Sequence, residues 1–197
     1  MNDPHVVALH YRADAGEGVE YRAGESVTVS APDFTGTLEA GRFVAKMSTH
    51  YPTQDEARIP VDAYVRAWEI SIGVLRGRKE LSFTFERAEI IDRAPPPGSL
   101  RMSGHATVTV TGYAPTLTVT RNYPPPPEHF TATPLVESLW LRYERYTQNQ
   151  EPLLGMAYYC LTRLERDAGS RRAVARKFGI AHSVLDTIAS TELGARG

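Results

Sequence analysis

Apolar and polar residues alternate along much of the first part of the chain, and a period of two predicts β-strands with one buried face. Ala40 and Gly41 separate two such segments, which indicates a hairpin closed by a tight turn. Residues 112–115 separate two others and indicate a second hairpin. The pattern therefore predicts an antiparallel sheet of about six strands, drawn from residues 6–11, 26–30, 34–39, 42–48, 81–91, 102–111 and 116–121.

One stretch within this region changes to a helical period. Thr53, followed by Glu56 three positions later, has the spacing of a capping box at a helix N-terminus. Pro60 lies early in the stretch, so it either kinks the helix or opens its main part at the first turn. We expect one long helix packed on the antiparallel sheet, which makes residues 1–123 an α+β domain. The apolar stripe of this helix consists of Val61, Tyr64, Val65, Trp68 and Ile72.

Four consecutive prolines, beginning at Pro124, mark a change from strand-like to helical periodicity. A proline run adopts an extended geometry and continues neither a helix nor a central strand. We therefore expect residues 124–130 to be a proline-rich linker between two domains. Residues 131–197 have the helical period, and Thr133 and Ser170 stand where two of the helices need N-caps. The second part is predicted to be a C-terminal four-helix domain.

The last two of these helices surround a glycine turn. Ala175 is small at the point where the two helix axes would cross, and Gly179 falls four residues later, where a sharp turn needs a positive φ. At these positions the stretch 171–188 resembles the helix-turn-helix of DNA-binding proteins. The resemblance implies a helix-turn-helix at about residues 170–193. Its corner would be closed by the apolar residues Val174, Phe178, Ile180, Val184, Leu185 and Ile188.

The composition indicates the general class of protein but no reaction that it would catalyse. The 42% hydrophobic and 23% charged content of the 197 residues is typical of a globular protein. The formal net charge of −1 creates no overall field, so binding to nucleic acid would need a local basic patch. A single cysteine, Cys160, excludes an internal disulfide framework. No signal-peptide pattern and no bilayer-length apolar stretch is found, so we expect a cytoplasmic protein without a membrane partner.

The helix-turn-helix resemblance implies that the second helix of the motif enters the major groove and that its exposed residues read base edges. Positive charge lies on the preceding helix, where it could hold phosphates and supply affinity without sequence information. The first hypothesis is therefore a non-enzymatic interaction or regulatory protein that contacts DNA or RNA through its C-terminal domain. The residues predicted to contact nucleic acid are Arg171, Arg172, Arg176, Lys177, His182 and Ser183.

Two alternatives remain open. In the first, the helix-turn-helix is purely structural and the protein is an interaction or assembly module, with a protein partner or a second copy of itself. The second rests on Arg176 and His182, whose spacing is similar to the Arg-x4-6-His motif of the HEPN family. That resemblance implies a ribonuclease in which the histidine acts as general acid or base and the arginine stabilises the phosphate charge. Gly179 is expected to break the helix between the two residues.

Motifs for other chemistry do not occur in the sequence. There is no Gly-x-Ser-x-Gly elbow, no dinucleotide fingerprint and no phosphate loop. The remaining histidines are scattered singly, without the i, i+4 spacing of a helical metal site. Outside the ribonuclease alternative we therefore predict no catalytic residues, no cofactor and no metal, and the protein is not expected to be an enzyme.

Overall fold

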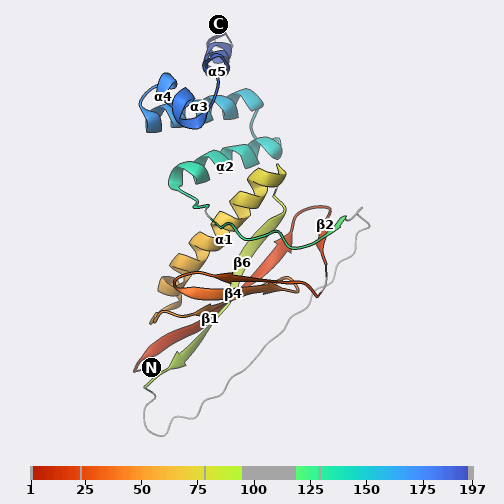
Figure 1. Cartoon of the computed structure of the whole chain (residues 1–197), viewed down its shortest axis with the longest axis vertical. Helices are drawn as coiled ribbons and strands as arrows, with labels where there is room; N and C mark the ends of the chain where they lie inside the picture. Colours follow the sequence, from red (N-terminus) through yellow and green to blue (C-terminus); the bar gives the residue numbers. More distant parts are fainter. Residues whose placement is uncertain (1, 23, 78, 95–118, 129, 195–197) are drawn as a thin grey trace. The chain divides into compact units, whose positions relative to one another are not determined.

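The computed structural model describes residues 2–22, 24–77, 79–94, 119–128 and 130–194, without the side chains of 191–194 (Figure 1). It is a mixed α+β structure with a five-stranded antiparallel sheet, and the described ranges contain five helices. The chain divides into two compact units, Met1–Thr131 and Ala132–Gly197, which are described in turn.

The sheet of the first unit has the strand order β3-β4-β5-β1-β6, and every neighbouring pair is antiparallel. Ala40 (φ 48°) and Gly41 (φ 73°) both have the left-handed backbone of a tight two-residue hairpin turn between β4 and β5. This confirms the predicted hairpin. The strands are β1 (Pro4–Ala15), β3 (Ser26–Ser30), β4 (Phe34–Glu39), β5 (Arg42–Met47) and β6 (Leu81–Asp92).

The described part of the second predicted hairpin does not belong to this five-stranded sheet. Residues 102–111 lie outside the described residues. The described end of the other segment, β7 (Val119–Arg121), pairs in parallel with β2 (Val19–Tyr21) in a separate two-stranded sheet. The expectation of about six strands in one sheet was therefore wrong for β7. Beside this pairing, Arg121 Nη1 donates to both carboxylate oxygens of Glu80.

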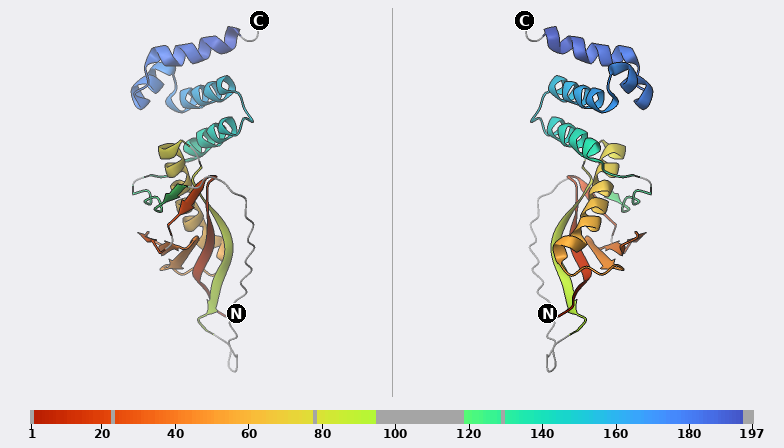
Figure 2. Two further views of the ribbon diagram at one scale, coloured as in Figure 1. Left: turned by 90° about the vertical axis from the view of Figure 1, so that its right-hand side faces the viewer. Right: turned by 90° about the vertical axis from the view of Figure 1, so that its left-hand side faces the viewer.

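Helix α1 (Gln54–Arg76) lies along one face of the sheet and packs against β1 and β6 (Figures 1 and 2). Thr53 Oγ1 accepts a hydrogen bond from Glu56 N at 3.3 Å, which confirms the predicted N-cap. Pro60 lies inside the helix, well past its first turn. Of the two alternatives for Pro60, the one in which it opens the main helix is wrong, because Thr53 already caps a helix that begins six residues earlier.

Aromatic side chains fill the space between α1 and the sheet. The Phe43 ring contacts the Trp68 ring edge-to-face, with centroids 6.1 Å apart, and both side chains are fully buried. Gly36 on the neighbouring strand makes room for Phe43, because a Cβ at Gly36 would lie 2.4 Å from two carbons of the ring. The core is thus filled so closely that one methyl group would not fit.

The second unit contains α2 (Pro134–Thr147), α3 (Leu153–Ala168), α4 (Arg171–Phe178) and α5 (His182–Gly194). Helix α3 packs against each of the other three helices, and α4 packs against α5. The two predicted N-caps are confirmed. Thr133 Oγ1 accepts from Val136 N, and Ser170 Oγ accepts from Ala173 N, each at 3.3 Å.

Candidate nucleic-acid interface

The turn between α4 and α5 has the geometry that its glycine predicts. Gly179 has φ 66°, and its N–H donates to Ala175 O at the C-terminus of α4. The N–H of Ile180 donates to the same oxygen at 3.1 Å. Two backbone N–H groups at the turn thus donate to the carbonyl oxygen of the small residue Ala175. The chain reverses direction at Gly179 without steric strain.

Three helices contribute one buried side chain each to the core beneath this turn, and Ala175, Ile180 and Ile188 pack around them. Two of the residues expected to close the corner are instead exposed, Phe178 by 41% and Val184 by 50%. Val184 precedes a buried position on α5 by one residue, so it points about 100° away from the core. Phe178 is the last residue of α4, at the margin of the cluster. The three buried side chains are Leu161, Val174 and Leu185.

An ion-pair network joins α3, α4 and α5. Arg171 donates from Nε to Glu165 Oε1 at 2.7 Å and from Nη1 to Asp186 Oδ1 at 2.9 Å. His182 Nδ1 lies 2.8 Å from the other carboxylate oxygen of Asp186. The hydrogen bonds from Arg171 and then His182 lower the pKa of Asp186 below its ordinary value. The guanidinium of Arg171 is therefore paired with two carboxylates of its own unit, and the sequence analysis did not predict this pairing.

The other three predicted phosphate-binding residues separate into two groups. Lys177 Nζ donates to Asp167 Oδ2 at 2.6 Å, so this lysine is also paired. Arg172 and Arg176 are exposed, lie four positions apart on α4 and form no ion pair with any described residue. Side chains at this spacing share one face of a helix. These two arginines are the basic residues of the motif that remain open to a phosphate.

Four exposed side chains of α5 within the described residues are uncharged. Ser183, Val184, Thr187 and Ser190 are all exposed and recur at positions that share one side of the helix. Thr187 Oγ1 donates to Ser183 O, and Ser190 Oγ donates to Thr187 O. Asp186, a carboxylate that would repel phosphates if it were unpaired, is bound to Arg171 and His182. The i, i+4 spacing of His182 and Asp186 is the sequence signal that would have indicated this pairing.

The structure does not bring the proposed ribonuclease pair together. Arg176 lies on α4 and His182 is the first residue of α5, with the Gly179 turn between them. The described contacts include none between the two side chains, and the imidazole of His182 pairs with Asp186. The expectation that Gly179 breaks the helix is confirmed.

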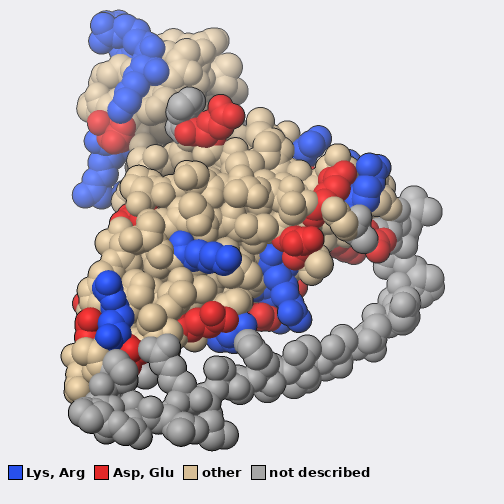
Figure 3. Space-filling model, turned by 60° about the horizontal axis from the view of Figure 1, so that its bottom comes forward, with Lys and Arg blue, Asp and Glu red and all other residues tan. Residues whose placement is uncertain are grey.

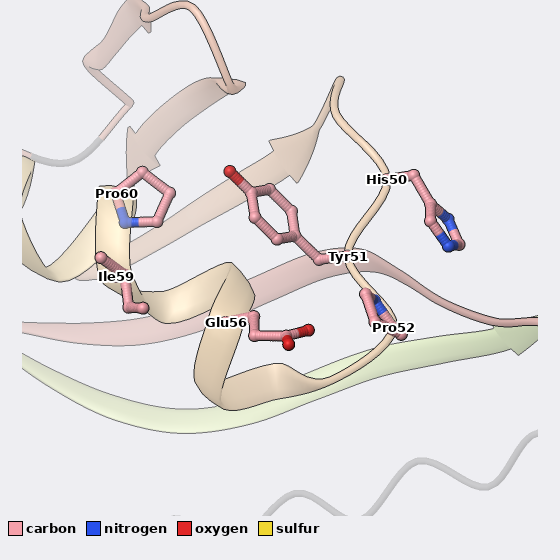
Figure 4. A pocket seen from close by; sticks show the side chains of 6 residues that line it. All are labelled: His50, Tyr51, Pro52, Glu56, Ile59 and Pro60. Carbon is pink, nitrogen blue, oxygen red and sulfur yellow. The ribbon is translucent and has the colours of Figure 1, made fainter.

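A hollow of about 410 Å³ lies on the first unit, beside the N-terminal turns of α1 (Figure 4). Its lining is mainly apolar, and the Tyr51 ring lies beside Ile59 and Pro60. Glu56 supplies the one carboxylate, so the hollow carries no charge that would attract a phosphate. Basic and acidic side chains are interspersed over the face shown in Figure 3.

Comparisons with models of protein families, with curated proteins and with solved structures find no match for this chain. Within the described ranges, no helix is both long enough and apolar enough to cross a lipid bilayer. The geometry of the second unit is therefore the basis for proposing a function.

Proposed function

We propose that the second unit is a four-helix domain whose helix-turn-helix, formed by α4 and α5, binds duplex nucleic acid in a non-enzymatic cytoplasmic protein of interaction or regulation. One observation carries the proposal. Between Ser183 and Ser190 the exposed side of α5 presents hydroxyl groups and one apolar side chain, while the carboxylate of Asp186 is ion-paired with Arg171 and His182. The pairing reduces the repulsion between this carboxylate and phosphates.

Each part of the motif has a distinct task in this proposal. Ser183 and Thr187 face the edges of bases, where a hydroxyl both donates and accepts hydrogen bonds. Arg172 and Arg176 contact phosphates and fix the orientation of the domain on the duplex. Arg171 is a positioning residue, because it binds α5 to α3 and α4 and does not reach the partner itself.

The test is binding of the full chain to a fluorescent duplex DNA of mixed sequence at several KCl concentrations. The double variant Arg172→Gln/Arg176→Gln is expected to bind at least tenfold more weakly. Its salt dependence should fall by about two in slope, since each lost phosphate contact removes roughly 0.9. Arg145→Gln/Arg166→Gln is the matched control, because it removes the same charge from exposed positions of α2 and α3. Equal losses in both double variants would contradict the proposal, as would no binding at low salt.

The exposed apolar residues Phe178 and Val184 favour a second candidate, an assembly module in which this corner contacts a protein or another copy of the chain. Light scattering over a range of protein concentrations distinguishes the two. An assembly module would show a mass that rises with concentration and returns to the monomer value on Phe178→Ser. If RNA included in the binding assay were cleaved by the wild type but not by His182→Ala, the ribonuclease alternative would replace both.

A further inference from the structure

A pocket of about 330 Å³ lies in the first unit where the C-terminus of α1, the strands β2 and β7 and the proline run meet. This is within the size range of small-molecule sites. It is separate from the helix-turn-helix, and no step of the proposed function uses it. The residues that line it are Tyr21, Arg76, Glu80, Arg121, Asn122, Tyr123, Pro124 and Pro125.

Two guanidinium groups converge on one buried carboxylate in this pocket. Glu80 is only 4% exposed, and Arg121 Nη1 lies 3.0 and 3.2 Å from its two carboxylate oxygens. Arg76 Nε is 3.9 Å from Glu80, too far for a hydrogen bond. Arg121 is therefore hydrogen-bonded to Glu80, whereas Arg76 lies beside the same carboxylate without a hydrogen bond to it.

The guanidinium of Arg76 is placed to contact a ligand in the pocket. Its side chain is 51% exposed and donates no hydrogen bond to any residue that the structure describes. A guanidinium offers a planar pair of N–H donors that matches the two oxygens of a carboxylate.

Tyrosine and proline side chains form walls of the pocket, and hydrogen bonds hold the two tyrosines in place. The rings of Tyr21 and Tyr123 lie 4.6 Å apart. Tyr21 Oη donates to Glu80 O at 2.6 Å, and burial together with the charge of Glu80 raises the Tyr21 pKa to about 12, so the phenol keeps its proton at neutral pH. Tyr123 Oη accepts from Gly41 N at 2.7 Å, and Pro124 beside it is buried. A planar apolar group could stack here without reordering the walls.

We propose that this pocket binds a small carboxylic acid with a flat apolar group, its carboxylate on Arg76 and its ring against Tyr21, Tyr123 and Pro125. The recognition is that of an aromatic monocarboxylate, in which the guanidinium supplies charge and orientation and the walls supply apolar contact.

Benzoate is the probe, titrated into the ¹⁵N-labelled full chain and followed by NMR shifts of backbone amides and arginine Nε–H groups. We expect saturable shifts at residues 21, 76 and 121–123 with a dissociation constant on the order of 1 mM, which is ordinary for so small a ligand. Benzamide, which has the same shape without the charge, should bind at least tenfold more weakly.

The variant Arg76→Gln should weaken benzoate by about tenfold or more and leave benzamide unchanged, because it removes one charge-assisted hydrogen bond. Lys46→Gln removes the same charge at an exposed position on β5 and should change benzoate binding less than twofold. Arg76 is half exposed, so the amide spectrum of the variant should retain its dispersion. Equal binding of benzoate and benzamide, tighter binding of inorganic phosphate, no effect of Arg76→Gln or no shift at 20 mM benzoate would each overturn the proposal.

Discussion

The two units keep their helices in place by different means. In the first, α1 is held on the sheet by a large aromatic core in which rings contact one another edge-to-face. In the second, the buried core under the helix-turn-helix consists of three aliphatic side chains with partly buried aliphatic residues around them. Helix caps and the ion pairs of Arg171 and Lys177 add further contacts at that corner.

This difference indicates which kinds of substitution each unit should tolerate. Burial supplies most of the stability of a folded domain, whereas exposed ion pairs contribute little each. The first unit should therefore be rigid and intolerant of changes in side-chain volume. The corner formed by α4 and α5 should be the less stable region and the one that responds to salt, pH and a charged partner.

The largest effect is expected from Phe43→Ala. The ring is fully buried between Trp68 and the sheet, so its removal should lower the free energy of unfolding of the first unit by about 3–5 kcal/mol. Urea unfolding measures the loss, and hydrogen exchange of the first-unit amides locates it. Thr37→Ser, an exposed position on the neighbouring strand, should stay within about 0.5 kcal/mol of the wild type. A loss below 1 kcal/mol for Phe43→Ala would show that the aromatic core is not close-packed.

A smaller effect is expected from Leu185→Ala in the core of the second unit. The side chain is buried, but few large neighbours surround it and the site can partly collapse, so we expect a loss of about 2–3 kcal/mol. Hydrogen exchange should accelerate in α4 and α5 and remain unchanged in β1. The adjacent Val184→Ala is the control, because half of that side chain is already exposed. Similar effects of the two substitutions would contradict the buried and exposed assignments.

The smallest effect concerns Asp186. Its pKa is lowered in the folded state, so the stability that it contributes is present above the unfolded value of about 3.9 and is lost as the pH falls through the folded value. Asp186→Asn should therefore destabilise α4 and α5 slightly at pH 7, and the effect should disappear once the pH falls below the lowered pKa of the folded state.

Thermal unfolding of the wild type and of this variant across that pH range provides the measurement. Glu137→Gln, an exposed carboxylate on α2, is the control. A difference between Asp186→Asn and the wild type that persists unchanged at low pH would mean that the ion pair is not its source.

Local signals in the sequence predict much of this structure. The alternation in β4 and β5, the stripe of α1, the caps at Thr133 and Ser170 and the turn at Gly179 each depend on residues within a few positions of one another. The same is true of the buried positions in α4 and α5 that follow the helical period.

Features set by distant residues could not be predicted. The parallel pairing of β7 with β2 accompanies a contact between Arg121 and Glu80, 41 positions apart. The occupation of Arg171 and Lys177 by carboxylates depends on how α3, α4 and α5 cross. For that reason only two of the four basic residues predicted to bind phosphates, Arg172 and Arg176, form no ion pair with a described residue.

The hydrogen bond from Gly41 to Tyr123 spans 82 positions of sequence. It fixes the β4–β5 hairpin turn to the segment that begins the proline run, so the end of the first unit is part of its architecture. A shortened protein that stops at the end of β6 would lose this partner of the Gly41 N–H, the second wall of the carboxylate pocket and the arginine that neutralises Glu80. The smallest piece of the chain that can be expected to fold as the first unit therefore extends through Pro124.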